Sequence, residues 1–411
     1  MRVTTVFRKL LDVTSLVVQA VGFESGQAVL DVRPRWRRAR CGTCGRKCPR
    51  YDRKRTRRWR ALAYGPLRVV LRYAPRRVWC ARCGGVRIEK VPWARHGSWF
   101  TERLEELVAY LVQVTDKTTV TRLMGISWEA VDGIVRRIVH DRLMPERLVG
   151  LQRIGIDEFS YRKRHRYITV VVDHDTQRVV WAAEGRGADT LGRFFDALGE
   201  ERVAQLKLVT IDMAGGYKKA LRDRAPHVQV IFDRFHVQRL ASDAVDQVRR
   251  SLWRTLKGTD GADDLKGTRY ALLKSPWNLT RHERQKLHEL QRTNRKLYRA
   301  YLLKEALARA LDYKQPKRAE RALREWLAWA SRSRLAPFVR VARTIRGHLD
   351  GILAYIRHRL TNGVVEGINN RLRMVARRAF GFHSPGALIA MVHLCAGHVP
   401  LNPPLPLPTQ P

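Results

Sequence analysis

Two aspartates follow apolar runs of the kind that form buried β-strands. Asp157 follows Ile154-Gly-Ile, and Asp212 follows Leu208-Val-Thr-Ile. A buried carboxylate without a partner is costly, and two carboxylates on adjacent strands repel each other unless a divalent cation lies between them. Hard oxygen ligands of this kind hold the metal ions of phosphoryl-transfer sites. The alternative is that each aspartate caps the loop at the end of its strand.

A third carboxylate lies far downstream, in a segment whose pattern predicts a helix. Thr361 or Asn362 is a suitable N-cap for this helix, and Glu366 lies one turn into it. Glu366 can therefore face the sheet, with Asn370 one turn further along the same face. A set of three carboxylates favours a metal site over separate loop caps. Glu158 is excluded from the set because neighbours on a strand point to opposite faces.

Apolar, β-branched runs alternate with helical patterns between residues 151 and 235. They predict strands at 153–159, 167–173, 178–183, 206–212 and 228–233, a turn at 174–177, and helices at about 189–198 and 217–224. Three consecutive strands followed by alternating helices and strands is the order of a ribonuclease-H-like mixed sheet. In that order the first and fourth strands are neighbours, which places Asp157 beside Asp212.

Five of the six cysteines fall between residues 41 and 83. Cys41 and Cys44 form one C-x-x-C pair and Cys80 and Cys83 form another, which is the ligand spacing of a structural zinc site. Cys48 is surplus: it lies just outside the ligand shell or replaces Cys44 in it. The alternative to zinc is a group of reduced core cysteines or a redox pair.

The chain carries 80 Lys and Arg residues against 38 Asp and Glu residues, a formal net charge of +42. A positive excess of this size repels itself unless a polyanion neutralises it, and nucleic acids are the commonest such partners inside cells. Arginines interleaved with aromatic residues flank the first cysteine pair, at 33–40 and 50–60. We therefore expect contact with DNA phosphates, although a single basic run also fits a solvated surface.

Apolar residues recur at helical spacing between residues 101 and 143. Thr101 and Ser127 are suitable caps for the first and third of three helices, and Gly125 fits the tight turn before the third. The pattern resembles a helix-turn-helix whose last helix carries Arg136 and Arg137. Three-helix packing is also common in proteins that do not bind DNA.

Taken together, these motifs resemble the zinc-finger-bearing DDE transposases of the bacterial ISL-three insertion-sequence family. The resemblance runs from about residue 36 to residue 396. Besides the paired C-x-x-C motifs, it rests on Gly155-Ile-Asp-Glu-Phe, Ile211-Asp-Met, Phe232-Asp-Arg-Phe-His and Asn362-Gly-Val-Val-Glu-Gly-Ile-Asn-Asn, in that order.

The resemblance implies an enzyme that binds the terminal inverted repeats of its own mobile element and then cuts and joins DNA. It places the catalytic triad on Asp157, Asp212 and Glu366, with magnesium, or manganese, as the working metal. Asp233 and His236 match a D-x-x-H feature of such enzymes, and His236 either touches DNA near the scissile phosphate or braces the active-site loop. The implied partners are terminal-repeat DNA, target DNA and further copies of the chain, in a homodimer or a larger synaptic complex.

The expected fold is a multidomain α+β chain. We expect a zinc-finger domain at 1–90, a helix-turn-helix at 91–150, a ribonuclease-H-like catalytic core at 151–236 and 361–398, an all-helical insertion at 237–360 and a loose proline-rich tail at 399–411. The residues expected to contact DNA are ten arginines: Arg37, Arg38, Arg40, Arg55, Arg57, Arg58, Arg136, Arg137, Arg371 and Arg373.

No apolar run is long enough to span a membrane, and the start of the chain lacks a secretory signal pattern, so we expect a soluble, nucleoid-associated protein of the bacterial cytoplasm. The sequence contains no glycine-rich phosphate loop, so we expect no nucleotide cofactor.

Two functions other than a transposase are also compatible with a basic chain. A non-catalytic DNA-binding regulator derived from a transposase has no chemical need for three carboxylates, and a structural RNA binder explains the charge but not the sheet order.

Overall fold

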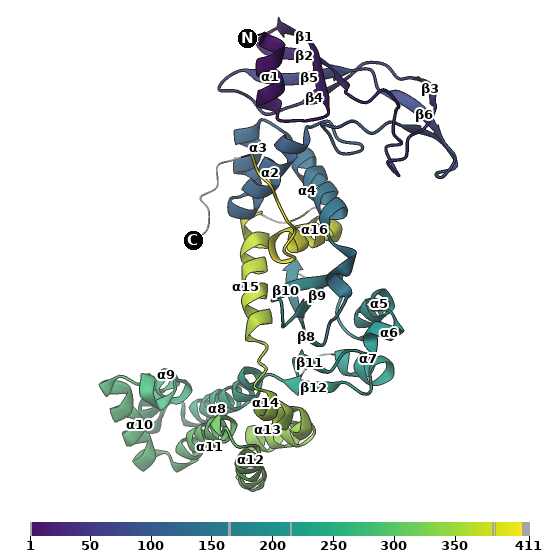
Figure 1. Cartoon of the computed structure of the whole chain (residues 1–411). Helices are drawn as coiled ribbons and strands as arrows, with labels where there is room; N and C mark the ends of the chain where they lie inside the picture. The colour runs from purple at the N-terminus through teal and green to yellow at the C-terminus, as the bar shows by residue number, and fades with distance from the viewer. Residues whose placement is uncertain (1, 163–165, 214–215, 380–381, 383, 405–411) are drawn as a thin grey trace. The chain divides into compact units, whose positions relative to one another are not determined.

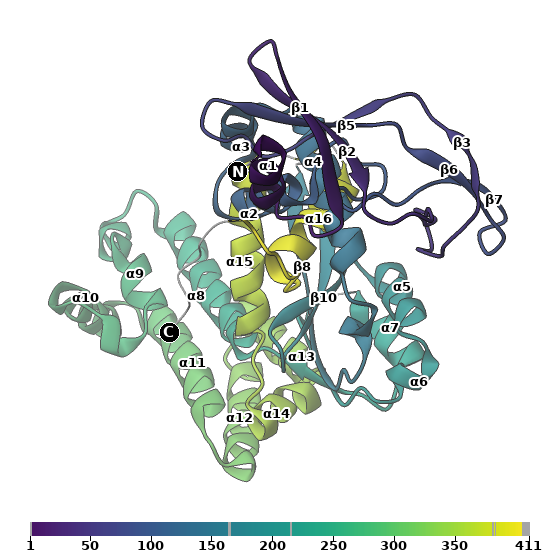
Figure 2. The ribbon, with the colours of Figure 1, turned by 45° about the horizontal axis from the view of Figure 1, so that its top comes forward.

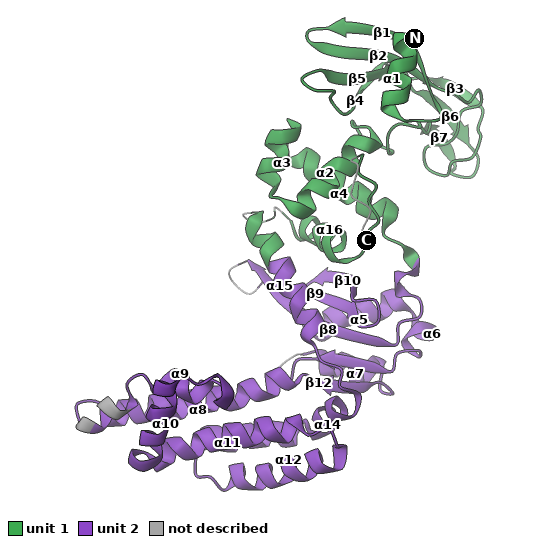
Figure 3. Cartoon of the chain, turned by 60° about the vertical axis from the view of Figure 1, so that its left-hand side comes forward, with its two compact units in different colours: residues 1–145, 374–411 green, residues 146–373 purple. Residues whose placement is uncertain are grey.

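The computed structural model describes residues 2–162, 166–213, 216–379, 382 and 384–404. It divides into two compact units, residues 1–145 with 374–411 and residues 146–373 (Figure 3). The first unit holds the paired cysteines and the predicted helix-turn-helix, and the second holds the candidate carboxylates. In the part of the chain that the structure describes, no helix is long and apolar enough to cross a membrane.

The first unit begins with α1 (Val3–Leu11) and two small β-sheets. The strands of these sheets are β1 (Leu16–Glu24), β2 (Gln27–Pro34), β3 (Arg50–Arg53), β4 (Arg57–Arg60), β5 (Arg68–Tyr73), β6 (Arg76–Cys80) and β7 (Gly85–Ile88). One sheet has the order β1-β2-β5-β4, and the other has the order β3-β6-β7. Every second residue of β5 is buried, so this strand presents one apolar face to the core. Trp93 closes that core, edge-on to Trp59 and Tyr73 with ring centroids 5.6 and 5.5 Å away.

Three helices follow, as predicted: α2 (Glu102–Val114), α3 (Lys117–Met124) and α4 (Trp128–Arg142). The Thr101 hydroxyl accepts a hydrogen bond from the backbone N–H of Leu104, and the Ser127 hydroxyl accepts one from Ala130. Gly125 ends α3 in the left-handed conformation, with φ of 55°. The two predicted caps and the predicted turn are therefore confirmed.

The end of the chain returns to these helices. The last helix, α16 (Pro385–Ala396), packs against α4 and α2, and Leu394 accepts a hydrogen bond from the Gln113 side chain at 2.7 Å. The predicted second part of the catalytic core spans residues 361–398, whereas the boundary between the two units follows residue 373.

The prediction of a loose tail is wrong for residues 399–404. The Pro400 carbonyl accepts a hydrogen bond from Arg142 at 2.6 Å, and the Asn402 N–H donates to the Glu106 carboxylate at 3.0 Å. Prolines prevent helix and ladder formation, but their carbonyl groups still accept hydrogen bonds, and such bonds hold this segment. Residues 405–411 lie outside the described residues.

The second unit is built around a five-stranded sheet of order β10-β9-β8-β11-β12. Its elements are β8 (Arg153–Arg162), β9 (Arg166–Asp173), β10 (Arg178–Glu184), α5 (Ala188–Leu198), α6 (Glu200–Val203), β11 (Leu208–Ile211), α7 (Tyr217–Arg224) and β12 (Gln229–Phe232). β8, β9 and β10 pair antiparallel, whereas β11 pairs parallel with β8 and with β12. As predicted, the first and fourth strands are neighbours.

Helices cover both faces of this sheet. The helix α15 (Gly363–Arg378) lies on one side, and α5 to α7 lie on the other (Figures 1 and 2). Consecutive residues of β8 therefore face different helices, because side chains alternate along a strand.

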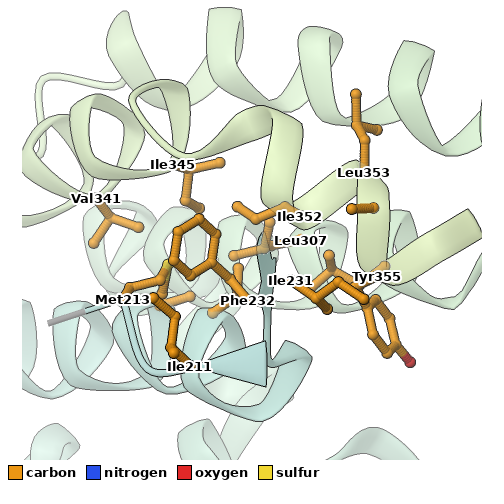
Figure 4. Packing of buried hydrophobic residues seen from close by; sticks show 14 of the residues in the cluster. Ile211, Met213, Ile231, Phe232, Leu307, Val341, Ile345, Ile352, Leu353 and Tyr355 are labelled. Atoms are coloured by element: carbon orange, nitrogen blue, oxygen red, sulfur yellow. The ribbon is translucent and has the colours of Figure 1, made fainter. Parts of the chain in front are cut away.

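The segment between β12 and α15 contains no strand among its described residues. Its helices are α8 (Arg234–Leu256), α9 (Thr268–Leu273), α10 (Arg281–Thr293), α11 (Arg295–Asp312), α12 (Pro316–Ser331), α13 (Ala336–Arg346) and α14 (Leu349–His358), with short 3-10 turns at Asp260–Leu265 and Pro276–Asn278. Ile345, Ile352 and Leu353 pack around Ile231 and Phe232 (Figure 4). The helices thus share one hydrophobic core with the sheet.

Gly351 allows this packing. A Cβ at this position would lie 2.4 Å from the Phe232 ring and 3.0 Å from the Val230 carbonyl oxygen, so a larger residue forces α14 away from β12. We predict that Gly351→Ala lowers the free energy of unfolding by about 1–3 kcal/mol, the usual cost of overpacking.

Urea denaturation followed by circular dichroism measures the effect. The control is Gly192→Ala in α5, where an added Cβ meets nothing within 4 Å. This control is expected to be neutral or to stabilise by up to about 1 kcal/mol, because alanine favours a helix over glycine. Equal stability of the two variants would contradict the packing argument.

Candidate active site and cysteine cluster

The register of β8 and β11 sets the two aspartates level. Thr210 of β11 pairs with Gly155 of β8, so two residues further along each strand Asp212 lies beside Asp157. Both side chains are partly buried. Burial is the main reason why the pKa of Asp157 is raised, and hydrogen bonds from the Glu158 N–H and the Asn369 side chain oppose that shift.

The helix α15 lies directly on β8. A Cβ at Gly155 would fall 2.3 Å from the Cγ2 atom of Val365, so only glycine permits this approach. One turn further along the helix, the Asn369 side chain donates a hydrogen bond to the Asp157 carboxylate at 2.7 Å. Asn362, which precedes α15, is buried, as are four residues of the helix itself: Val365, Asn369, Leu372 and Val375.

Glu366 lies on the flank of α15 and is exposed, as is Asn370. Among the described residues, four cysteines form the one group of three or more acidic, histidine or cysteine side chains close enough together to share a metal ion. The structure therefore places Asp157 level with Asp212 but does not gather both with Glu366 around one point.

Asp233 and His236 adjoin Asp212. Asp233 is 1% exposed, caps α8 by accepting the Phe235 N–H at 3.2 Å, and also accepts the Asn362 N–H at 3.2 Å. His236 lies between two carboxylates, with Nδ1 3.4 Å from Asp233 and Nε2 3.5 Å from Asp212. The neighbouring Asp233 carboxylate, followed by the charge of Asp212, raises the pKa of His236 against the opposing effect of burial.

Glu158 lies on the other face of β8. Its carboxylate accepts a hydrogen bond from the Tyr217 hydroxyl at 2.9 Å, and that hydroxyl is also 2.9 Å from Thr169. Tyr217 is the first residue of α7, so this contact ties the helix that follows Asp212 to the central strand. Burial is the main reason why the pKa of Glu158 is raised.

The two C-x-x-C pairs converge in the first unit. Cys41 lies 3.9 Å from Cys83 and Cys44 lies 3.5 Å from Cys80, measured between sulfur atoms. A tetrahedral zinc with Zn–S bonds of about 2.3 Å has sulfur–sulfur edges of about 3.8 Å, so this cluster fits zinc. The backbone N–H of Cys83 lowers the pKa of the Cys80 thiol to about 6, which favours its thiolate, whereas the Cys44 side chain raises the pKa of the Cys83 thiol, so the fit to zinc rests on the sulfur geometry. Cys48 lies outside the group, and its sulfur contacts the Arg46 carbonyl at 3.4 Å.

Several of the predicted DNA-contacting arginines are engaged within the protein. Arg57 donates to the Ser98 carbonyl at 2.7 Å and stacks on Trp99, 4.0 Å from the ring centroid. Arg137 forms an ion pair with the fully buried Glu105 at 2.6 Å. Arg136 donates to Asp132 and Ser384, and Arg373 donates to Asn370. Arg58 pairs with Glu24 at 3.1 Å but keeps an exposed side chain. The other arginines of the set are also exposed: Arg37, Arg38, Arg40, Arg55 and Arg371.

Comparison with known proteins identifies the family. Residues 154–392, more than half of the chain, match the model of the ISL3 DDE domain, described as a transposase. Residues 89–139 match the helix-turn-helix domain of transposase family ISL3. The chain belongs to the ISL3 family of transposases. Transposases of this kind cut and rejoin DNA, so DNA is the partner of this transposase, and the predicted helix-turn-helix is confirmed.

Curated relatives agree with this assignment. The chain is 40% identical to the transposase for insertion sequence element IS1557 of Mycobacterium tuberculosis, over 98% of each chain. It is 32% identical to the transposase for insertion sequence element IS1001 of Bordetella parapertussis, over 83% of this chain and 85% of the relative.

Sequence reasoning missed the asparagines that touch the aspartate strands. It singled out Asn370, whereas Asn369 is the residue that contacts Asp157. The signal was present in the sequence, because Asn362 and Asn369 are seven residues apart and such residues share one face of a helix. Tyr217 gave no comparable signal.

We predict that the cysteine cluster holds one zinc ion per chain. Cys80→Ser should lose the zinc and unfold the β3-β6-β7 sheet, because that ion would replace the apolar core that so small a sheet lacks. Elemental analysis of protein purified without chelators measures the zinc.

Cys48→Ser is the matched control, since Cys48 lies in the same segment but outside the cluster. It should retain one zinc ion per chain. Loss of zinc from Cys48→Ser together with its retention in Cys44→Ser would show that the ligand set is wrong.

Proposed function

We propose that this transposase binds the terminal inverted repeats of its own insertion sequence, and that it cuts and joins DNA in a metal-dependent DDE reaction at Asp157, Asp212 and Glu366. The observation that carries the proposal is the parallel register of β8 and β11, which sets Asp157 level with Asp212. The strand order and directions of the sheet are also those expected of a ribonuclease-H-like core.

The donor set suits a hard divalent cation, because carboxylate oxygens are the ligands that magnesium and manganese prefer. Asp157, Asp212 and Glu366 would hold these ions. When bound, magnesium supplies activation of the attacking oxygen and stabilisation of the leaving oxygen. Glu366 is exposed beside the buried face of α15, where its carboxylate is accessible to metal and substrate.

His236 would brace this site. Its two ring nitrogens face Asp212 and Asp233, so the imidazole links the strand-end aspartate to the cap of α8. Of the two roles that the sequence left open, these contacts favour bracing of the Asp212 loop over direct contact with DNA.

The substrate chemistry comprises two displacements at phosphorus. Water attacks the phosphate at the element end and the bond to the 3′-oxygen breaks, which leaves a 3′-hydroxyl. That hydroxyl then attacks a phosphate of the target DNA and displaces another 3′-oxygen. Because both element ends undergo these steps, we propose that a homodimer or a larger assembly carries them out.

A groove of about 830 Å³ in the first unit is suited to a DNA backbone. It is lined by arginines from several strands and loops, namely Arg33, Arg37, Arg53, Arg58, Arg72 and Arg76, and by Trp36. Asp31 is the acidic residue in the lining, and Arg72 already pairs with it at 2.7 Å. Arg33 and Arg53 are exposed, so both are available to phosphates.

We predict that Asp157→Asn, Asp212→Asn and Glu366→Gln each reduce cleavage by more than about 100-fold. Loss of a residue that only supports a metal ligand already costs about 10- to 100-fold, and loss of the ligand itself costs more. Binding of the element end should be almost unchanged. Nicking of a duplex that carries the element end, in magnesium buffer, measures the effect.

Asp223→Asn is the control, since Asp223 lies on α7 and pairs with Arg222. It should cut at the wild-type rate. If the wild-type protein bound the ends but cut neither strand, the chain would instead be a non-catalytic regulator derived from a transposase. If a triad variant cut DNA at the wild-type rate, the assignment of that residue to the catalytic triad would be wrong.

We predict that Arg33→Gln with Arg53→Gln weakens end binding and reduces the slope of log affinity against log salt by about 2, because each phosphate contact adds about 0.9. Fluorescence anisotropy at several salt concentrations measures both quantities. Arg222→Gln with Arg321→Gln removes two exposed arginines of the second unit as a charge-matched control. An unchanged slope in the groove variant would exclude the groove as a phosphate site.

A further inference from the structure

Two buried asparagines connect α15 to the strands of both aspartates. Asn369 is fully buried and Asn362 is 2% exposed, although each carries four hydrogen-bonding positions on its amide. Asparagine is seldom buried so completely without a specific partner. The two residues are seven apart, which is about 10 Å along a helix and nearly the same rotational position.

Asn369 fixes the orientation of the Asp157 carboxylate. Its Nδ2 donates to Oδ2 at 2.7 Å, and the backbone N–H of Glu158 donates to Oδ1 at 2.8 Å. A carboxylate otherwise rotates freely about its last bond, and one donor on each oxygen holds its plane. Two of the four lone pairs remain for other ligands.

The other end of the Asn369 amide has no protein partner. Its Oδ1 is buried without a hydrogen-bond donor in the part of the chain that the structure describes. A buried acceptor without a donor costs about 1–3 kcal/mol, so stability alone gives no reason to place an amide here. The amide cannot reverse, since Oδ1 would then face the Asp157 carboxylate.

Asn362 makes the corresponding contacts at the start of α15. Its Oδ1 accepts a hydrogen bond from the Thr210 hydroxyl at 2.8 Å, two residues before Asp212 on β11. Its backbone N–H donates to Asp233, which also contacts His236. The Thr210 hydroxyl is in turn 2.8 Å from Nε2 of His174, whose pKa burial lowers to about 4.

Glu366 lies between these two contacts, four residues after Asn362 and three before Asn369. One contact on β11 and one on β8 fix both the rotation of α15 and its position along its own axis. We propose that Asn369, with Asn362, is a positioning residue: it orients the Asp157 carboxylate and sets the place of Glu366 relative to both aspartates. This inference rests on the metal-dependent reaction proposed above.

The test measures binding of Mn²⁺ alone to the full-length, zinc-loaded protein by calorimetry. The variant is Asn369→Leu, which has the same branched arrangement of side-chain heavy atoms and removes the donor to Asp157. Affinity for Mn²⁺ should fall by about 10- to 100-fold, the usual effect of losing a residue that orients a metal ligand. The magnesium concentration for half-maximal cleavage should rise by a similar factor, while end binding stays unchanged.

Asn370→Ala is the matched control. Asn370 is the next residue of the same helix, is exposed, and accepts a hydrogen bond from Arg373. It should bind Mn²⁺ as the wild type does. Urea denaturation of both variants shows whether each is folded, and Asn369→Ser replaces the leucine variant if the latter fails to fold.

The outcomes separate this inference from the proposed function. If Asp157→Asn binds Mn²⁺ as tightly as the wild type, the proposed metal site itself is wrong. If Asp157→Asn loses Mn²⁺ but folded Asn369→Leu keeps both its Mn²⁺ affinity and its magnesium requirement, the asparagine has only a packing role and this inference is overturned.

Discussion

The helix α15 lies against β8 at the point where that strand has no side chain. At Gly155, Val365 occupies the space that any other residue would fill with a Cβ atom. This contact brings polar side chains of the helix within hydrogen-bonding distance of the sheet, so Asn369 reaches Asp157 and Asn362 reaches Thr210. A residue with a side chain at position 155 would separate the two layers, and both hydrogen bonds would be lost together.

In the first unit, two buried glutamates are neutralised by ion pairs with arginines. Glu105 and Glu106 are buried in α2, and Arg95 pairs with both. Arg137 and Arg142 add further pairs to the same carboxylates. Removing one member of such a cluster leaves a buried charge without a partner, which is strongly destabilising. These arginines therefore serve the fold, whereas the arginines that we propose as phosphate contacts in the first unit lie on strands and loops near the cysteine cluster.

The elements of the second unit were predictable because each has a clear pattern. Continuous apolar runs marked the central strands, and β8 and β11 were expected as neighbours from strand order alone. The rotational phase of α15 was not predictable, since Asn369 and Asn370 differ by about 100° around the helix and only packing decides which is buried. The sequence also could not show which arginine side chains are engaged within the protein. Arg57 and Arg58 are adjacent, yet Arg57 stacks on Trp99 and Arg58 is exposed.

The helical segment from α8 to α14 begins and ends at the same place. Asp233 caps its first helix, and the N–H of Asn362, 129 residues later, donates to the same carboxylate. Bringing the two ends of so long a segment together costs chain entropy, but this cost grows only slowly with the length of the segment. The hydrophobic core that the helices share with the sheet around Phe232 offsets the cost. Because α14 packs on β12 through Gly351, the chain re-enters beside the sheet already in position to start α15. The place of Glu366 thus depends on packing at the sheet edge as well as on the two asparagines, and a change at that edge would reach the carboxylates through the start of α15.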